Sequence, residues 1–564
     1  MTTAGGILLR LPHSLRPAAS RWGDPALAIA AALGALLLRF SAAGRGIDSL
    51  YDEGIVAGAG WRVLTGQVPY RDFWHLHGPG TAWLVAGCFR LFGTSIAVER
   101  ALDAAVFAAS AGLVCVLARV QTGRVAALAA AGLFVLSTGQ TTSLRPRDLG
   151  LLFVLAAFGA CLAWFERPER QGWLVAGGLL AGASAWFKQD FAAAAAGAML
   201  VAVLSRGDTR LGARVKDGFV LAASALAAFL PVPAILFFEG ALRDAWRQAI
   251  VFPATQFESV RGLSVAGFGT HARGLLSRGA PIREVLVAAT PLFVFGFVVA
   301  ALIAALDLLR KRNGRAPVVL LGLGLLGLFL LARVRADAEH LLPPLALALV
   351  LVAWWVDAPA PHAHFRRAAG ALGAAGACLL TLLSIPAVAA RTPIPGSVPP
   401  PGVDEAFRTR TRGLTGADPD FLIAAADVAS HTRDGEAVFC GNSRHDVTSV
   451  NPALFYFAAG RPNATRYDNL HPGVVTSPEV QREIASDLEA KHVRVVVLWS
   501  EPGIAGTGEA SPGGARFLDA YLRKTFAPAG IHGRYEVRVR GENGESRENQ
   551  AASRDASPSA APPK

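Results

Sequence analysis

Charged residues are scarce in this sequence. Asp, Glu, Lys and Arg make up 17% of its 564 residues, whereas hydrophobic residues make up 52%, and the mean hydropathy is +0.39. Such a composition excludes a soluble enzyme of this size and predicts a polytopic membrane protein. The net charge of +12 does not indicate nucleic-acid binding, because much of the excess lies in short segments between apolar runs, where it reports orientation in a membrane.

Cysteine is also scarce. Four of the five cysteines lie in or beside apolar segments, and Cys440 stands alone in the more polar C-terminal part. This excludes a disulfide framework and a CxxC metal pair there. The first apolar run is not followed by a convincing small-residue cleavage site, so we interpret it as a retained helix that follows a cytoplasmic N-terminus, residues 1–24.

Long apolar runs dominate the first two thirds of the chain. A membrane-spanning helix needs roughly 20 mostly apolar residues, and a charge at its centre costs about 2.5–3.5 kcal/mol, so we end each span at a charged cluster. This predicts eleven transmembrane helices, at residues 25–43, 96–118, 125–139, 149–165, 173–187, 191–204, 219–238, 285–306, 318–332, 341–356 and 368–390.

The loops between these spans support the assignment, because the loops predicted to be cytoplasmic carry the expected excess of Lys and Arg. The pattern requires that the partly apolar residues 80–93 do not cross the membrane. We interpret them as an interfacial helix on the outer face, with Trp83 and Phe89 on its apolar side.

The C-terminal part has a different organisation. A proline-rich linker, residues 391–403, follows the apolar region 25–390 and precedes residues 404–540. Asp-Pro and Ser-Pro pairs predict helices from residue 418 to 431 and from 477 to 491, and apolar runs predict strands at 437–440, 493–500 and 535–539. We expect an extracytoplasmic α/β domain there, followed by a disordered tail, residues 541–564.

Polar and aromatic residues are concentrated in the first outer loop, residues 44–95. It contains YDEG from Tyr51, GQVPYRDFW from Gly66 and HGPG from His77. This density is unusual for a simple connector. Asp52 or Glu53 could serve as a general base if held near the membrane surface, although a solvated loop acid would look the same in the sequence.

Three other outer segments place charges beside helix ends, on a face that should be poor in basic residues. They are RPRD at residues 145–148, FKQD at 187–190 and RVRADAEH at 333–340. Together their cations favour phosphate binding. Singly, each could instead be an interfacial anchor or a headgroup contact.

The combination of YDEG after the first span, GQVPYRDFW, HGPG and the later LFG and VER resembles bacterial family 39 glycosyltransferases of the GT-C class. These are relatives of protein O-mannosyltransferases and lipid A aminoarabinose transferases. The motifs cover residues 51–100, and by topology the resemblance covers residues 25–390. It implies a sugar donor on a polyprenyl phosphate and catalysis by Asp52, and it maps an acidic residue of the second outer loop onto Asp148.

The expected reaction is an inverting transfer to a hydroxyl on an envelope glycan, lipid or protein, at the outer face of a bacterial plasma membrane. Asp52 would be the base, with Glu53 or Asp148 in support. The leaving phosphate needs positive charge, for which the candidates are Lys188, Arg333, Arg335, His340 and Arg145. Candidates for contacts with the acceptor in the first outer loop are Tyr51, Tyr70, Asp72, His75 and His77.

Other interpretations of these residues remain open. Asp148 could simply stabilise the start of a helix, or could share a divalent cation with Asp52. No metal site is predicted for His75 and His77, because no third ligand stands at a telling spacing. Relatives often have Lys-Pro-Pro near the end of the first loop, whereas this chain has His77, Gly78 and Pro79, so the lysine's role cannot be carried over.

Two other functions fit a polytopic chain. A transporter or lipid flippase would place charged or helix-breaking residues near the span centres, but here the polar residues gather at one face. An assembly protein anchored by its membrane part would not need eleven spans.

Overall fold

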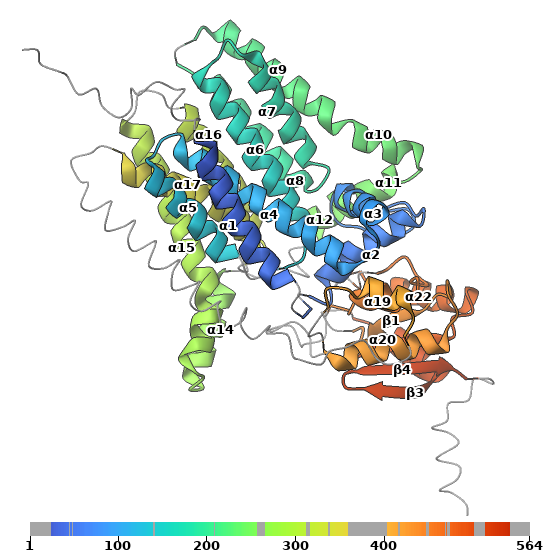
Figure 1. Cartoon of the computed structure of the whole chain (residues 1–564). Coiled ribbons are helices and arrows are strands. Elements are labelled where there is room, and N and C mark those ends of the chain that lie inside the picture. The colour runs from blue at the N-terminus through green and yellow to red at the C-terminus, as the bar shows by residue number, and fades with distance from the viewer. Residues whose placement is uncertain are drawn as a thin grey trace, which may run out of the picture.

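The computed structural model forms a bundle of long helices with a smaller, sheet-containing part at one end (Figure 1). The structure describes residues 24–43, 46–47, 49–138, 142–207, 209–256, 265–311, 316–336, 339–358, 403–414, 418–446, 450–468, 470, 474–500 and 514–541.

The bundle contains most of the apolar sequence. Its helices are α1 (Pro25–Ala43), α4 (Ile96–Arg119), α5 (Arg124–Thr138), α6 (Pro146–Glu166), α7 (Gln171–Ser184), α8 (Gln189–Leu204), α9 (Leu211–Phe229), α10 (Pro231–Phe238), α14 (Val265–Ser277), α15 (Ile282–Lys311), α16 (Ala316–Ala332) and α17 (Leu342–Asp357). Ten of the predicted spans overlap these helices, and the eleventh, 368–390, lies outside the described residues. Among the residues that the structure describes, four stretches are long and apolar enough by themselves to cross a membrane, namely Ile96–Arg119, Pro146–Glu166, Leu211–Phe238 and Ala288–Arg310. The number of spans stays a prediction.

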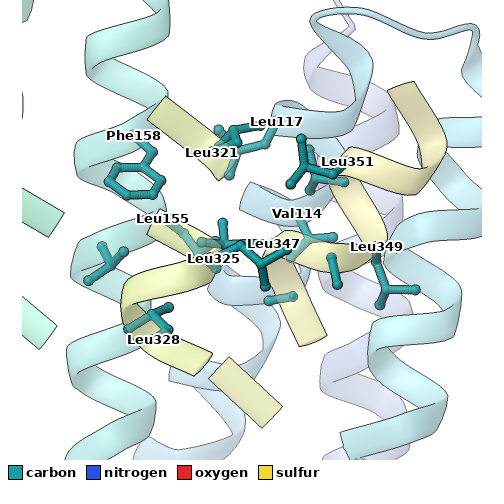
Figure 2. Packing of buried hydrophobic residues seen from close by; sticks show 14 of the residues in the cluster. Val114, Leu117, Leu155, Phe158, Leu321, Leu325, Leu328, Leu347, Leu349 and Leu351 are labelled. Atoms are coloured by element: carbon teal, nitrogen blue, oxygen red, sulfur yellow. The ribbon is translucent and has the colours of Figure 1, made fainter. Parts of the chain in front are cut away.

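Leucines of α16 and α17 fill the centre of the bundle between α4 and α6 (Figure 2). Small residues let the helices approach closely where no large side chain separates them. At Gly182 of α7, an added Cβ would lie 2.0 Å from the carbonyl oxygen of Ala225 on α9. Only glycine therefore fits this α7–α9 contact, because the neighbouring atom is rigid backbone.

The first outer loop is more ordered than predicted. Helix α2 (Asp52–Leu64) begins within the YDEG motif, and α3 (Gly80–Phe92) follows at the position of the expected interfacial helix. Both lie between the bundle and the C-terminal part (Figure 1). Phe89 stacks on Phe457 of that part, with ring centroids 5.5 Å apart, and Trp83 contacts Trp186. The apolar side of α3 thus packs against other parts of the protein, and the interfacial position of this helix stays a prediction.

After α10, three short helical segments return to the first outer loop. They are α11 (Leu242–Ala245), the π-helix η3 (Trp246–Val251) and α12 (Phe252–Thr255). The carbonyl of Ala249 accepts a hydrogen bond from the side chain of Gln189 at the start of α8, at 2.7 Å. This contact fixes η3 against the bundle.

The C-terminal part contains a mixed sheet of order β1-β2-β4-β3. Strand β1 (Phe439–Asn442) runs parallel to β2 (Val495–Trp499), while β4 (Tyr535–Arg540) is antiparallel to both β2 and β3 (Phe526–His532). The accompanying helices are α19 (Glu405–Arg410), α20 (Pro419–His431), α21 (Leu454–Ala459), α22 (Pro478–Ala490) and α23 (Phe517–Thr525).

Local sequence explains most of these elements. The side chain of Asp418 caps α20 and that of Ser477 caps α22, as the Asp-Pro and Ser-Pro pairs predicted. Strand β3 was missed, because its Ala-Pro-Ala-Gly run has low strand propensity and it forms only by pairing with β4.

Candidate active site

A cavity of about 1000 Å³ lies where the bundle meets the first outer loop. Helices α7, α9 and α16 contribute apolar lining, mainly alanine, leucine and phenylalanine side chains. The charged lining comes from helix ends and from the segments between helices. The cavity therefore combines a surface suited to a hydrocarbon chain with a group of charges suited to a polar head.

The charged lining unites four segments that are far apart in the sequence. They are the start of α2, the RPRD segment before α6, the FKQD segment before α8 and the segment that follows α16. Their charged lining residues are Asp52, Arg145, Arg147, Lys188, Asp190, Arg335 and Glu339, accompanied by His340. The sequence had singled out each segment separately, and the tertiary structure brings them to one place.

Asp52 is the first residue of α2. Its backbone N–H donates to Ser49 Oγ at 2.9 Å, and that hydroxyl lies 3.1 Å from the Asp52 carboxylate, to which it donates. Arg145 Nη1 lies 3.9 Å from Asp52 Oδ2, and the side chain remains 46% exposed. The carboxylate is thus held from one side while a substrate in the cavity can still reach it, as a general base requires.

Two arginines share one carboxylate on the opposite segment. Arg145 Nε lies 3.2 Å and Arg147 Nη1 lies 3.0 Å from Oε2 of Glu339. Both arginine side chains are buried, whereas Glu339 is 40% exposed. Because a buried guanidinium needs a charged partner, Glu339 holds this pair of cations at the cavity surface.

Lys188 supplies a further cation. Its Nζ lies 3.0 Å from Asp190 Oδ2 and 5.5 Å from the centre of the Phe191 ring. These contacts direct the ammonium group along the start of α8, where Gln189 and Asp190 also line the cavity. A phosphate here would meet several donors at once.

Comparisons with known proteins concern the family and the fold of this chain. Residues 76–235 match the model of a family described as dolichyl-phosphate-mannose-protein mannosyltransferase. The structure is similar to that of ArnT from Cupriavidus metallidurans in the apo state, with a TM-score of 0.54 and 16% identity over 94% of this chain and 100% of that chain. The chain described here therefore has the GT-C fold. The resemblance that the motifs indicated is thereby confirmed.

A second structure of ArnT from the same organism is bound to undecaprenyl phosphate. It matches with a TM-score of 0.54 and 15% identity over 93% of this chain and 99% of that chain. No curated protein matches this sequence.

Within the GT-C fold, Glu53 does not lie where the sequence suggested. It does not line the cavity, and its side chain is fully buried in an ion pair with Arg100, at 2.6 Å. Asp52 and Glu53 therefore point to different surroundings, because consecutive residues of a helix are about 100° apart. We assign Glu53 a structural role, which is to fix the start of α2 through its ion pair with Arg100.

Asp148 and Arg333 also lie outside the cavity. Asp148 accepts a hydrogen bond from the backbone N–H of Arg145 at 3.1 Å and lies 3.3 Å from Arg147 Nε. It caps α6, which is the helix-start interpretation, and it also orients the RPRD segment. The side chain of Arg333 is exposed, whereas Arg335 and His340 line the cavity.

The candidate acceptor residues of the first outer loop divide in the same way. Tyr51, His75 and His77 line the cavity, but Tyr70 and Asp72 do not. Burial raises the pKa of Tyr70, whose hydroxyl donates to the carbonyl of His77. A hydrogen bond from Arg71 lowers the pKa of Asp72. Both side chains therefore stabilise the loop through contacts outside the cavity.

His75 is buried, and this burial lowers its pKa to about 4, so its imidazole is neutral at neutral pH. A neutral imidazole can exchange hydrogen bonds with hydroxyl groups but provides no charge for a phosphate. Among the residues that line the cavity, the positive charge is supplied by Lys188, Arg145, Arg147 and Arg335.

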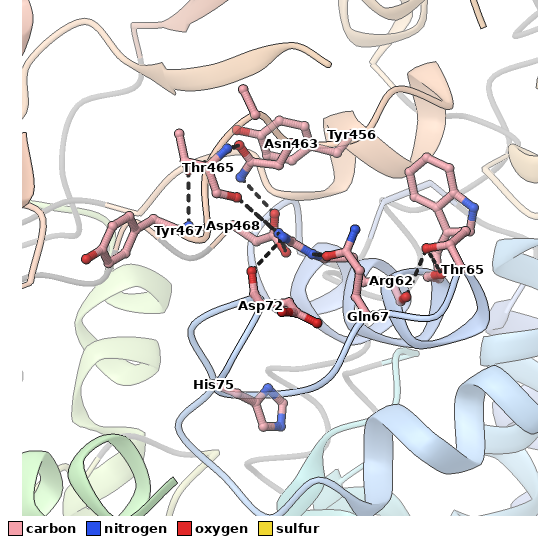
Figure 3. A network of polar contacts seen from close by, with 12 residues as sticks. Arg62, Thr65, Gln67, Asp72, His75, Tyr456, Asn463, Thr465, Tyr467 and Asp468 are labelled. Carbon is pink, nitrogen blue, oxygen red and sulfur yellow. Dashed lines mark hydrogen bonds and ion pairs between the residues drawn. The ribbon is translucent and has the colours of Figure 1, made fainter. Parts of the chain in front are cut away.

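The C-terminal part is joined to the first outer loop by a polar network around Arg62 (Figure 3). This buried arginine forms an ion pair with Asp468 at 2.7 Å and donates to the carbonyls of Thr465, at 3.3 Å, and Asp72, at 3.1 Å. Sequence analysis missed it, because its partners in the C-terminal part lie some 400 positions away, as Thr465 does at 403. These contacts consequently fix the loop that lines the cavity to the C-terminal part of the protein.

Proposed function

We propose that this protein is a membrane glycosyltransferase that transfers a sugar from a polyprenyl phosphate to a hydroxyl group at the outer face of a bacterial plasma membrane. The observation that carries this proposal is the single cavity that joins apolar walls to the Asp52 carboxylate and to a group of cations. The family match and the GT-C fold support the same class of reaction.

The donor fits this cavity by its chemistry. Alanine and leucine side chains of α7, α9 and α16 would contact the prenyl chain, because they offer it an environment as apolar as lipid. The phosphate would lie near Arg145, Arg147, Lys188 and Arg335. The binding of undecaprenyl phosphate by ArnT supports this class of ligand.

The transfer step assigns one role to each group. The Asp52 carboxylate accepts the proton of the acceptor hydroxyl while the oxygen attacks the anomeric carbon. The bond between that carbon and the phosphate oxygen breaks, and its electron pair leaves with the phosphate. The cations stabilise the added negative charge, which is larger in the transition state than in the bound donor. A single displacement of this kind inverts the anomeric centre.

No step of this proposal uses a metal. A cation shared by Asp52 and Asp148 would require both side chains at one site, but only Asp52 lines the cavity. Within the described residues, no three His, Cys, Asp or Glu side chains are grouped so that they could hold a metal ion. No step is therefore assigned to the divalent cation that the sequence left open, and that cation stays an untested prediction.

The C-terminal part would guide the acceptor, since it is fixed to the loop that lines the cavity. The alternative of a transporter or flippase is less well supported. The charged residues that line the cavity come from helix ends and from the segments between helices, and the buried ion pair of Arg39 on α1 with Asp103 on α4, at 2.7 Å, does not line it.

Lipid binding tests the donor class. Undecaprenyl phosphate retained by the detergent-purified protein would be measured by mass spectrometry for the wild type, Arg335→Ala and Arg333→Ala. The loss of one charge-assisted contact should weaken binding about 10- to 100-fold in Arg335→Ala. Arg333→Ala is the matched control, because this exposed arginine lies outside the cavity. Equal retention by both variants would contradict the proposed phosphate position.

Turnover tests the reaction. A panel of undecaprenyl phosphate glycosides, with neutral and amino sugars, would be incubated with membranes, and released undecaprenyl phosphate would be measured. Asp52→Asn should reduce release about 10²- to 10⁴-fold while undecaprenyl phosphate binding is retained. Full activity of a folded Asp52→Asn protein would refute the assignment of the base.

A further inference from the structure

Four consecutive residues, Trp74 to His77, form one wall of the cavity. They follow Tyr70, whose φ of +70° lies in the left-handed region that residues other than glycine seldom adopt. Such a conformation persists only where surrounding contacts hold it. The contacts that hold this segment are therefore informative about the site.

Gln248 on η3 provides two of these contacts. Its Oε1 accepts a hydrogen bond from the backbone N–H of His75 at 2.9 Å, and its Nε2 donates to the carbonyl of Tyr70 at 3.0 Å. The residue is 7% exposed, so both bonds are shielded from water. One amide side chain thus provides the two backbone hydrogen bonds that a neighbouring strand would provide in a sheet.

The position of Gln248 depends on the π-helix. A π-helical turn is wider than an α-helical one and is often found at functional sites. Ala249, the next residue, lines the cavity, and its carbonyl accepts the bond from Gln189, which lines the cavity as well. Helix η3 therefore connects the charged start of α8 with the Trp74–His77 wall.

A second support comes from the C-terminal part. Arg466 donates from Nη2 to the Tyr70 carbonyl at 2.7 Å, and its own carbonyl accepts from the N–H of Trp74 at 2.8 Å. The Tyr70 hydroxyl donates a hydrogen bond to the His77 carbonyl and so connects the two ends of the segment. The carbonyl of Tyr70 thus accepts from two donors, one on η3 and one in the C-terminal part.

We propose that Gln248 is a positioning residue of the transfer site, which holds the Trp74–His77 wall in the shape that receives the reacting sugar or acceptor. This inference rests on the proposed function. An indole and a neutral imidazole are side chains that suit a sugar ring, since one offers an apolar face and the other a hydrogen-bonding group. Such contacts require a fixed wall.

Hydrogen–deuterium exchange of the full-length protein tests the positioning directly and needs no substrate. In Gln248→Ala, the backbone amide of His75 should exchange about tenfold faster, because its acceptor is gone. Gln248→Glu keeps an oxygen for this amide and should leave its exchange closer to that of the wild type. Arg247→Ala is the control, because this neighbouring side chain is exposed. Exchange that is unchanged in Gln248→Ala, or equally accelerated in Arg247→Ala, would overturn the proposal.

Function is measured on the same variants. Gln248→Ala should bind undecaprenyl phosphate within about twofold of the wild type but release it at least about tenfold more slowly from the glycoside that the wild type uses best. Unchanged release would refute a role in positioning, and a loss of undecaprenyl phosphate binding would assign Gln248 to the donor instead. If the wild type uses no glycoside of the panel, the proposed function fails, whereas the exchange experiment still decides whether Gln248 holds the wall.

Discussion

Replacing Arg100 should show how Asp52, the proposed catalytic base, is supported. The guanidinium is fully buried and contacts both oxygens of Glu53, at 2.6 and 3.1 Å. It also donates to the carbonyls of Gly413, at 2.6 Å, and Gly46, at 2.8 Å. Arg100 therefore joins α4 to α2, to the segment before α2 and to the C-terminal part. Asp52 follows any movement of Glu53, because the two residues are consecutive in α2.

Arg100→Leu leaves the Glu53 carboxylate buried without its counter-ion. Breaking a buried pair in this way costs about 3–5 kcal/mol, whereas replacing both partners by apolar residues costs much less. The double variant Glu53→Leu with Arg100→Leu should therefore be more stable than Arg100→Leu alone. The free energy of unfolding would be measured by titration with denaturing detergent.

Arg90→Leu serves as the control for the loss of a charge, because Arg90 is exposed on α3. Turnover of the donor should also fall in Arg100→Leu, since Asp52 loses its support. A cost below about 1 kcal/mol, or a double variant that is as unstable as the sum of the single ones, would refute this reasoning.

Two further outcomes are expected. Gly54→Ala should destabilise the protein by about 1–3 kcal/mol or more, because the new Cβ would lie 1.9 Å from the backbone nitrogen of Leu454. Gly58→Ala in the same helix meets no atom within 4 Å and should be neutral or stabilising, so equal thermal stability of the two variants would contradict the packing argument. For His75, the folded pKa of about 4 lies below the unfolded value of about 6.5, so the unfolded chain binds more protons in this range. Its contribution to stability is complete above about pH 6.5 and falls as the pH drops towards 4; thermal unfolding at several pH values should show this dependence in the wild type, and a similar dependence in His75→Leu would refute it.

Much of the candidate site could be predicted, because its residues stand out where charge is unexpected. Asp52 follows an apolar run, and Arg145, Lys188 and Arg335 lie on a face that should be poor in basic residues. All four line one cavity. These residues stand out in the sequence because burying a charge at a membrane boundary is costly, so such charges are retained where they have partners or a function.

The predictions that differ from the structure, namely a loop at residues 52–64 and a site role for Glu53, share a different cause. The run from Asp52 to Leu64 is rich in glycine and was taken for a loop, although α2 forms there. Its glycines lower helix propensity but permit close packing, as at Gly54 against Leu454, and packing outweighs propensity. Once this segment is a helix, Asp52 and Glu53 face different surroundings. The sequence alone could not separate an acid that lines the cavity from one that is buried in an ion pair.

The amino-acid sequence by itself determined the membrane character of the chain, the approximate helices and the segments that carry charge. These follow from local properties, namely hydrophobic length, helix caps and charge distribution. Only the tertiary structure decided which charges meet. Glu339 reaches Arg145 across 194 positions, and Gln248 reaches His75 across 173. Such pairs form only when elements that are distant in the sequence pack together. No local sequence pattern specifies that packing, because these contacts form only once the chain has folded.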